Sequence, residues 1–474
     1  GILPVTYFFY KDLSNVSGKV LRLKSNRKGL DDNKMTENNI FKIFIKYTSF
    51  NVLGMIALSC YIFADTLFIS MGIGIDGLTA INLALPIFSL VNGSGLMIGM
   101  GGGTKYTLAV SRGKQQEGNK IFTNTLYMTA IFGIVFVILG IFFSGNIATL
   151  LGADEQVMAN TEIYLKMLLI FSPAFILNNI VQCFVRNDGA PHLSMIAMIV
   201  GSMSNMFLDW LFIFPFGMGM FGAVLATCLS PVFSLILTMQ YFIRKKNTFH
   251  VVKTKISGKA IGGIIASGFP SFLTEISTGI VLIVFNFLFM EIAGNTGVAA
   301  YGVIANLWFI VVSMFTGISQ GMQPIMSHNY GKGKYGNVNK ILKYGLILMG
   351  TFAAAIYAVM FFGSEYVAAI FNSEHNETLQ YIAEEGLKLY YIACPFVGFN
   401  IIISIFFTST EYPVPAHIIS ILRGFALIIP MAFIMLFAGG RIGLWMAFPV
   451  TEMIVTVIGI ILYIMRNRKL KEHT

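Results

Sequence analysis

The chain has 474 residues, of which 56% are hydrophobic and 11% are charged, and its net charge is +10. A soluble domain carries about 25% charged residues, so this chain lacks the charge to cover a surface that faces water. Soluble enzymes, disulfide scaffolds and disordered proteins are therefore poor fits. The 47 glycines point the same way, because Gly is frequent in membrane helices. The composition predicts a polytopic membrane protein.

Residues 1–38 form a polar tail ahead of the first apolar stretch. The tail shows no signal-peptide pattern, since its apolar run has no basic residue before it and no small-residue cleavage site after it. Met35 is a natural start just before the first apolar stretch, which makes 1–34 a candidate upstream extension. We expect the tail to be disordered or to form a surface helix.

Twelve apolar segments of membrane-spanning length, about 20 residues each, follow the tail. They start near residues 43, 79, 121, 161, 193, 221, 262, 298, 341, 385, 415 and 442. Six segments fall in residues 39–247 and six in 248–474. We predict an all-α protein with transmembrane helices 1–6 in an N-lobe and 7–12 in a C-lobe, which ends in a short cytoplasmic tail.

The basic residues are distributed unevenly between the two sides of this predicted topology. If both termini are cytoplasmic, the inner segments hold 28 of the 32 Lys and Arg residues, including Arg186 and six residues of the 244–259 linker. That excess follows the positive-inside rule. The net positive charge therefore reports topology and contact with anionic membrane lipids, and it does not indicate nucleic-acid binding.

The two halves of the chain are internal repeats of each other. The run LKMLLIFSP that ends at Pro173 matches LKLYYIACP, which ends at Pro395, and GMFGAVLAT (219–227) matches GRIGLWMAF (440–448). Six helices followed by six in the same orientation form a parallel repeat, whose axis lies along the membrane normal. This architecture is typical of transporters that bind substrate between the halves.

Four acidic residues lie well inside apolar spans: Asp65, Asp209, Glu275 and Glu452. A charge at the bilayer centre costs at least about 2.5–3.5 kcal/mol on insertion scales, so each acid needs a reason. The repeat supplies a control, because the polar residues of the first half have apolar counterparts in the second. The pairs are Tyr61 and Val281, Asp65 and Phe285, Asn179 and Ile401, Asn205 and Leu427, Asp209 and Met431, and Thr227 and Phe448.

Helical spacing groups these first-half residues. Tyr61 and Asp65 are four residues apart, as are Asn205 and Asp209, so each pair shares one helix face. Asn179 and Gln182 share a face of the fourth helix in the same way, and Thr227 lies on the sixth. Two carboxylates with amide and hydroxyl oxygens suit either a hard cation such as Na⁺ or shared protons. The alternative is that these side chains only bridge helices as structural hydrogen-bond partners.

With these residues in view, the chain resembles the multidrug and toxic compound extrusion (MATE) family, nearer its prokaryotic DinF-like and MepA-like branch. The resemblance covers roughly residues 40–465. It is carried in order by ADTLFIS, YLKMLLIFSPAFILNN with FVRNDGAP, SNMFLDWLFIF with GMFGAVLAT, and GISQGMQPIMSHNYGKGK. It implies a V-shaped pair of six-helix bundles in the bacterial plasma membrane, which exports organic cations and other amphipathic drugs in exchange for Na⁺ or H⁺.

The resemblance also implies roles for individual residues. The coupling-ion site of family members matches Asp65, Asn205, Asp209 and Thr227, which would also hold Na⁺, and Tyr61, Asn179 and Gln182 match neighbouring positions. Glu275 matches a second-lobe acid of some relatives, but residues 387–409 contain no acid, which disfavours a second-lobe cation site. Arg423 and Glu452 either pair within the second lobe or leave Glu452 facing substrate.

Other functions fit less well. A flippase for lipid-linked or polysaccharide precursors, from the same superfamily, needs a strongly basic cavity, and Arg423 is the one basic residue near mid-depth. A membrane enzyme needs a catalytic constellation, and the sequence contains no HExxH or GxSxG motif. A channel is disfavoured by the repeat and its one-sided polar cluster. We expect a monomeric antiporter with no cofactor, apart from the Na⁺ or H⁺ that it exchanges.

Overall fold

The computed structural model describes residues 39–372 and 376–472. The tail 1–38, for which we predicted disorder or a surface helix, lies outside the described residues. Every regular element within the described ranges is a helix, so the predicted all-α class is confirmed there. The first half folds into α2 (Ile40–Gly72), α3 (Ile75–Ser111), α4 (Gln115–Leu150), α5 (Met158–Ile170), α6 (Ser172–Asn187), α7 (Pro191–Ile213) and α8 (Gly219–Ile243).

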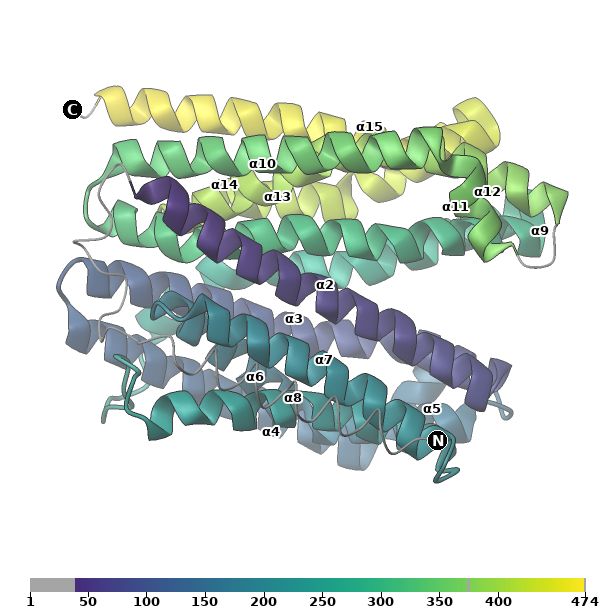
Figure 1. Ribbon diagram of the computed structural model, residues 1–474, viewed down its shortest axis with the longest axis horizontal. Coiled ribbons are helices and arrows are strands. Elements are labelled where there is room, and N and C mark those ends of the chain that lie inside the picture. Colours follow the sequence, from purple (N-terminus) through teal and green to yellow (C-terminus); the bar gives the residue numbers. More distant parts are fainter. Residues whose placement is uncertain (1–38, 373–375, 473–474) are drawn as a thin grey trace, which may run out of the picture.

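The second half begins with a very long helical element. Its elements are α9 (Gly258–Gly331), α10 (Tyr335–Phe362), α11 (Ser364–Phe371), α12 (Glu377–Tyr390), the 3₁₀ turn η1 (Tyr391–Ala393), α13 (Cys394–Ser409), α14 (Pro413–Ile421), the π-helical turn η2 (Leu422–Ala426) and α15 (Ile428–Glu472). Figure 1 shows the two halves as neighbouring bundles with roughly parallel helices, and α2 runs diagonally from one bundle to the other.

Nine of the described helices are long and apolar enough to cross a membrane. A tenth span results if α5 and α6 count as one, since they meet at a 48° bend. Pro173 explains this bend, because proline lacks a backbone N–H and clashes with the preceding turn. Two of the nine helices are interrupted, α9 at Gly294 and α15 at Gly440, where the backbone leaves helical geometry.

The internal repeat is visible in the backbone. Four pairs of residues with positive φ recur at the same spacing as the sequence repeat: Gly74 (88°) with Gly294 (59°), Gly113 (78°) with Gly333 (72°), Gly189 (95°) with Glu411 (57°), and Gly219 (56°) with Gly440 (57°). Positive φ is readily adopted by glycine, since it has no Cβ, and Glu411 is the one other residue type among these eight positions. The breaks inside α9 and α15 are thus the repeats of the turns that separate α2 from α3 and introduce α8.

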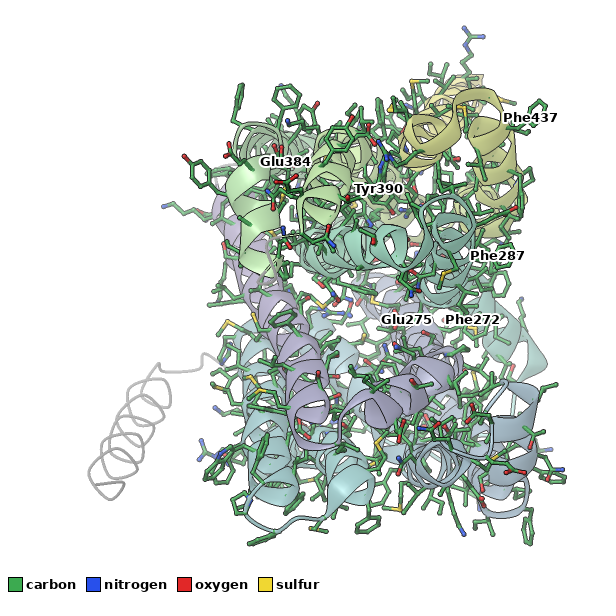
Figure 2. The ribbon with its side chains drawn as sticks, turned by 90° about the vertical axis from the view of Figure 1, so that its right-hand side faces the viewer. Phe272, Glu275, Phe287, Glu384, Tyr390 and Phe437 are labelled. Carbon is green, nitrogen blue, oxygen red and sulfur yellow. The ribbon has the colours of Figure 1, made fainter. Side chains whose placement is uncertain are left out.

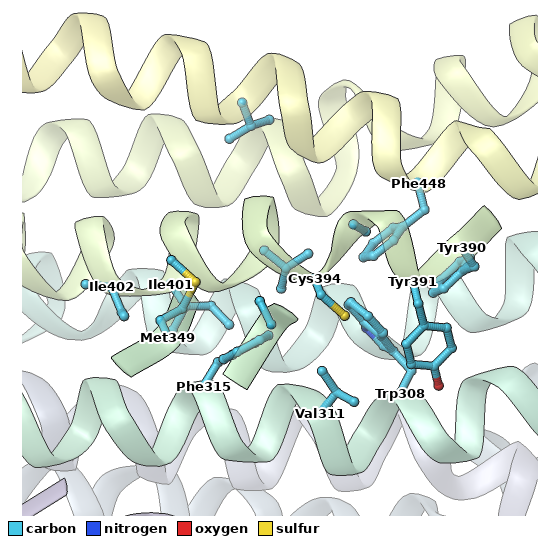
Figure 3. Packing of buried hydrophobic residues seen from close by; sticks show 14 of the residues in the cluster. Trp308, Val311, Phe315, Met349, Tyr390, Tyr391, Cys394, Ile401, Ile402 and Phe448 are labelled. Carbon is cyan, nitrogen blue, oxygen red and sulfur yellow. The ribbon is translucent and has the colours of Figure 1, made fainter. Parts of the chain in front are cut away.

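Each half has its own hydrophobic core, and α2 contributes to both. Its first part, through Ile40 and Phe44, packs into the second-half core, whereas Ile69 packs into the first-half core. The second-half core is rich in aromatic rings, as Figure 3 shows. Tyr390 and Phe448 stack with ring centroids 4.7 Å apart, and Trp308 meets both edge-on. Such pairs contribute about 0.5–1.5 kcal/mol each beyond their burial.

The linker between the halves is fastened along α4 of the first half. The backbone N–H groups of His250, Val252 and Ser257 donate to Asn119 Oδ1, Thr123 Oγ1 and Asn124 Oδ1, each at 3.1 Å. These acceptors lie within two turns on one stretch of α4, so successive linker residues find partners along the helix. The linker therefore belongs structurally to the first half up to the start of α9.

A buried ring and a buried acid anchor the linker at its beginning. The ring of Phe249 is fully buried against Tyr106, Phe122 and Phe184. Asp188, in the turn between α6 and α7, accepts hydrogen bonds from the Thr248 backbone N–H at 2.9 Å and from the Thr248 hydroxyl. Burial raises the pKa of the Asp188 carboxyl, and its bonds to Thr248 counteract that effect.

The two halves approach most closely at one end of the molecule. A Cβ added at Gly101 would lie 2.0 Å from the backbone oxygen of Ile264, and one at Gly268 would lie 1.8 Å from that of Met97. These glycines let α3 and α9 touch backbone to backbone, as small residues do in membrane helix pairs. We call this the closed end. It includes the start of α2, the end of α3 and both termini of α9.

Candidate functional site

Two acids lie at the centre of the first-half cluster. Asp65 is on α2 and Asp209 is on α7, and these helices pack side by side. Asp65 is 8% exposed and Asp209 is fully buried. The two carboxyl groups lie close enough to interact electrostatically. The structure therefore brings together the two acids that the sequence comparison singled out.

The polar atoms of this cluster lack hydrogen-bond partners. Asp65 Oδ1, both carboxyl oxygens of Asp209, and the amide oxygen and nitrogen of Asn205 have none among the described residues. Ionised carboxylates can only accept hydrogen bonds, so close contact between the two acids requires a proton or a cation between them. Buried oxygens without donors are the ligands that a hard cation uses. The donor set fits either H⁺ or Na⁺.

Two tyrosines lie close to the acid pair. Tyr61 is within electrostatic range of Asp65, Asp209 and Glu275, and buried Tyr164 on α5 is within range of Asp65 and Asp209. The sequence analysis named Tyr61 and missed Tyr164. Tyr164 carried no signal in the sequence, since a tyrosine in an apolar helix is ordinarily a core residue.

The remaining predicted first-half residues find partners of their own. The Thr227 hydroxyl donates to the backbone oxygen of Ala223 at 3.2 Å, within its own helix. Gln182 donates to Asn178 Oδ1 at 3.0 Å and to Ser234 Oγ at 3.1 Å. These contacts connect Gln182 to α8 and give it a helix-bridging position. Thr227 keeps an oxygen lone pair available, whereas the Gln182 amide nitrogen is committed to its partners.

A chain of amides connects the first half to Glu275 in the second. Asn179 Nδ2 donates to Asn92 Oδ1 at 2.9 Å, and Asn92 Nδ2 donates to Glu275 Oε1 at 2.8 Å. Figure 2, which looks along the helices, shows Glu275 and Phe272 where the two bundles meet. Asn179 thus donates to Asn92, and Asn92 in turn donates to Glu275, so the chain of amides ends at the acid. Asn92 was absent from the predicted site, although its polar side chain inside the long apolar α3 was a readable signal.

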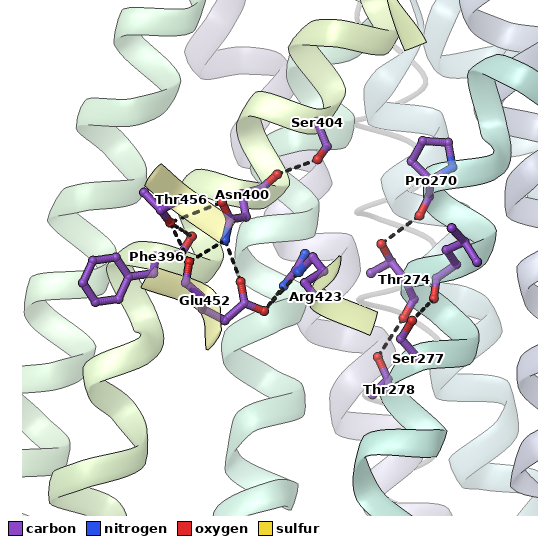
Figure 4. A network of polar contacts seen from close by, with 11 residues as sticks. Pro270, Thr274, Ser277, Thr278, Phe396, Asn400, Ser404, Arg423, Glu452 and Thr456 are labelled. Atoms are coloured by element: carbon purple, nitrogen blue, oxygen red, sulfur yellow. Dashed lines mark hydrogen bonds and ion pairs between the residues drawn. The ribbon is translucent and has the colours of Figure 1, made fainter. Parts of the chain in front are cut away.

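Arg423 and Glu452 form an ion pair inside the second half. Arg423 Nε donates to Glu452 Oε1 at 3.0 Å, and Asn400 Nδ2 donates to Glu452 Oε2 at 2.7 Å. Thr456 completes the network by donating to Asn400 Oδ1 at 3.2 Å (Figure 4). The Glu452 side chain is 1% exposed. Of the two arrangements that the sequence left open, this geometry matches pairing within the second half.

Two of the positions equivalent to the first-half cluster carry aromatic rings in the second half. Phe285, the counterpart of Asp65, stacks on Tyr301 with ring centroids 5.5 Å apart. Phe448, the counterpart of Thr227, stacks on Tyr390. The described residues contain no group of three or more His, Cys, Asp or Glu side chains that could bind a metal ion. Any cation site must therefore use amide and hydroxyl oxygens together with carboxylates.

The chain matches the MatE family model over residues 52–211 and 270–434. It belongs to the MatE family. This membership identifies a multi-pass membrane transporter and not an enzyme. A multidrug export protein MepA of Staphylococcus saprophyticus is 28% identical over 394 residues, which cover 82% of this chain and 86% of that protein. MepA of Staphylococcus aureus is 26% identical over 432 residues, which cover 90% and 95% of the two chains.

Solved structures show the same fold. An outward-facing multidrug resistance MATE transporter of the MOP superfamily superimposes with a TM-score of 0.86 at 21% identity, over 91% of this chain and 97% of that one. A MOP superfamily transporter from Pyrococcus furiosus, described as having a binding pocket of reverse polarity, gives a TM-score of 0.84 over the same shares at 21% identity. The MATE fold predicted by the resemblance is thereby confirmed.

The ion pair of the second half generates a stability prediction. Arg423→Met should destabilise this MATE chain by about 3–5 kcal/mol, because it leaves Glu452 buried without a cation. Arg423→Met combined with Glu452→Gln should recover much of that loss, since no unpaired charge remains. Thermal unfolding in detergent measures both variants. If the double variant unfolds at a lower temperature than Arg423→Met, the pair is not held together by its charges.

Proposed function

We propose that this MATE chain is a cation-coupled antiporter, which exports organic cations and other amphipathic drugs by alternating access in exchange for Na⁺ or H⁺. The observation that carries the proposal is the buried pair Asp65 and Asp209, in which Asp65 Oδ1 and both carboxyl oxygens of Asp209 have no hydrogen-bond donor among the described residues. The names of the staphylococcal multidrug export relatives support the substrate class. We further propose a monomer.

The proposed architecture has twelve spans in two lobes. The breaks at Gly294 and Gly440 divide α9 and α15 into two spans each, and α14 with η2 continues into the first part of α15. With α5–α6 and α12–α13 each counted as one span, the helices reach twelve. The boundary between residues 247 and 248 then falls inside the linker that is fastened to the first half.

Ion binding between Asp65 and Asp209 is coupled to the contact between the two lobes through α2. Two unit charges about 4 Å apart repel by about 4 kcal/mol at an effective dielectric constant of about 20. A proton or Na⁺ between Asp65 and Asp209 removes that repulsion and draws α2 and α7 together. Because α2 also packs into the second-half core, occupancy of the ion site acts on the contact between the halves. A ligand that binds one state better shifts the equilibrium towards it.

Glu275 is proposed to attract the cationic substrate. It is half-buried where the halves meet, and its carboxylate faces the amide chain from Asn92. The basic cavity that a flippase requires is not supported, because Arg423 is neutralised by Glu452 and the buried Arg186 is bound to the amide oxygens of Asn51 and Gln320. Drug export is therefore the better-supported of the two functions that the sequence left open.

The first test concerns orientation in the bacterial membrane. We propose that the closed end and both termini face the cytoplasm, because the basic connections lie at this end. In a Cys60→Ser background, an impermeant maleimide added to intact cells should label Glu155→Cys, in the α4–α5 turn, and leave Lys253→Cys in the linker unlabelled. Both positions are exposed, so access to them is comparable. The reverse labelling pattern contradicts this orientation.

The second test addresses the acid pair. Asp65→Asn and Asp209→Asn should each reduce ion-driven ethidium efflux by about tenfold or more, since a neutral amide cannot exchange an ion and about 1.4 kcal/mol corresponds to tenfold. Drug binding in detergent should persist, but its dependence on Na⁺ and pH should disappear.

Imposed Na⁺ and pH gradients, applied separately to everted vesicles, distinguish the two coupling ions. Asp76→Asn, which removes an acid away from the cluster, serves as the matched control. Efflux at the control rate by either cluster variant rules out the acid pair as the coupling site.

The third test addresses Glu275. Glu275→Gln should reduce transport of cationic drugs by about tenfold, equivalent to about 1.4 kcal/mol, and should affect neutral drugs much less, because the substitution removes charge and little volume. Parallel efflux assays with one cationic and one neutral substrate measure the ratio. An equal loss for both classes indicates that Glu275 supports structure and does not select charge.

A further inference from the structure

A buried arginine crosses the closed end between the halves. Arg186, in the last turn of α6, is 1% exposed. The sequence analysis counts it among the inner basic residues, and the structure shows that it is buried in the last turn of α6. Its Nη1 donates to Asn51 Oδ1 on α2 at 2.8 Å and to Gln320 Oε1 on α9 at 2.9 Å. Arg186 thus joins a first-half helix to the second half.

The charge of Arg186 has no acidic partner within residues 39–372 and 376–472. Its other contacts are the sulfurs of Met100 and Cys183, both 3.3 Å from Nη2, and its Nε has no hydrogen-bond partner. Among the described residues no carboxylate forms an ion pair with it. A buried guanidinium is normally paired, because removing an unpaired charge from water costs several kcal/mol. The hydrogen bonds to amide oxygens and the contacts with sulfur atoms offset part of this desolvation free energy.

A second polar connection runs beside the first. Asn187 Nδ2 donates to Gln323 Oε1 at 3.1 Å, and Gln323 Nε2 donates to Thr104 Oγ1 at 2.9 Å. Gln320 and Gln323 are one turn apart on α9, so they present neighbouring amides to the first half. Neutral amides make all the described second-half contacts to Arg186 and Asn187.

The surrounding backbone is packed as tightly as helices allow. A Cβ at Gly317 would lie 2.6 Å from the Val52 Cα, and one at Gly321 would lie 2.7 Å from the Thr48 Cα. These glycines flank Gln320 on α9. The tight packing excludes water from the guanidinium. Separation of the halves would let water solvate it again.

The internal repeat shows that this arginine is not required by the architecture. Its counterpart in the second half is Thr408, whose hydroxyl donates to the backbone oxygen of Ile405 within its own helix. A charge was therefore introduced at one of two equivalent positions. It lies where the two halves must separate if access alternates.

We propose that Arg186, bound to Asn51 and Gln320, is a gate between the halves, and that the absence of a carboxylate partner keeps the closed state weak enough to reopen in every cycle. The gate rests on alternating access from the proposed function and on nothing about the coupling ion. A carboxylate at position 320 would complete the ion pair only when the halves are closed. The closed state would then become too stable for rapid turnover.

The experiment measures the width of the gate directly. Spin labels at Lys114→Cys and Lys334→Cys, both exposed, occupy the turns after α3 and α9 at the closed end. The background is Cys60→Ser, since the other three cysteines are buried. Distance distributions are recorded in lipid nanodiscs without drug or ion gradient, so the gate is tested independently of coupling.

Gln320→Glu should enrich the short-distance population by about tenfold relative to the longer one, as expected for a desolvated charge pair, and should slow ethidium export. Gln320→Met, which removes the acceptor and adds no charge, should enrich the long-distance population. Gln320→Glu combined with Arg186→Met should lose the enrichment, because its carboxylate has no cation to face.

These outcomes separate the gate from general damage. Monodisperse elution and retained thermal unfolding show that a variant is folded, and Gln320→Met provides a reading even if Gln320→Glu is not folded. The gate is overturned if Gln320→Glu leaves the distances unchanged, or if Gln320→Glu and Gln320→Met shift them in the same direction. If the distances shift as expected but no variant transports drug, the gate stands and the proposed export function fails.

Discussion

The cost of burying charge where water is excluded decides how this structure is arranged. Backbone polar groups are satisfied within helices, so the free energy left to manage is that of a few ionisable side chains. Three solutions occur in the molecule. Arg423 and Glu452 neutralise each other inside the second half. Asp65 and Asp209 lie together with no basic side chain paired to them among the described residues, and Arg186 contacts amide oxygens and sulfurs. Each solution suits a different task.

A paired charge is fixed, and an unpaired one can respond. Asn400 and Thr456 add hydrogen bonds to the ion pair of Arg423 and Glu452. Both carboxyl oxygens of Glu452 have partners, so this network is part of the structural framework. The acid pair requires a proton or a cation to offset its charge repulsion. The desolvation cost of Arg186 falls when water reaches its guanidinium. The groups that are unsatisfied in this conformation are therefore the ones proposed to change state during transport.

The sequence predicted the fold well because its signals are long and repeated. Apolar segments and matching runs of sequence recur between the halves, and the backbone repeats with them, as the turns at Gly74 and Gly294 show. The pair Asp65 and Asp209 was also accessible, because aromatic or aliphatic counterparts exposed both acids as exceptions. The comparison of the two repeats, together with the four-residue spacing along each helix, therefore contains the identity of these acids.

Contacts between helices were not accessible in the same way. Tyr164 and Asn92 reach the site from α5 and α3, and nothing in the sequence of either helix predicts which helix it packs against. Asn179 was expected beside the acids, but its amide donates to Asn92 instead. An amide can bond to either kind of side chain, so the sequence alone does not decide between these partners. Arg186 was counted as a topological charge, because burial depends on how the halves meet and not on the local sequence.

The fastened linker has a mechanical consequence. Since residues 250–257 are hydrogen-bonded along α4, they cannot act as a slack tether, and free rotation is confined to the start of α9. There Ser257 caps the helix by accepting from the Ala260 backbone N–H. The linker therefore leaves little slack between the two bundles, which are also joined by the packing of α2 into both cores. If the bundles move relative to each other, residues 250–257 move with the first half, and the change in backbone direction falls at the start of α9.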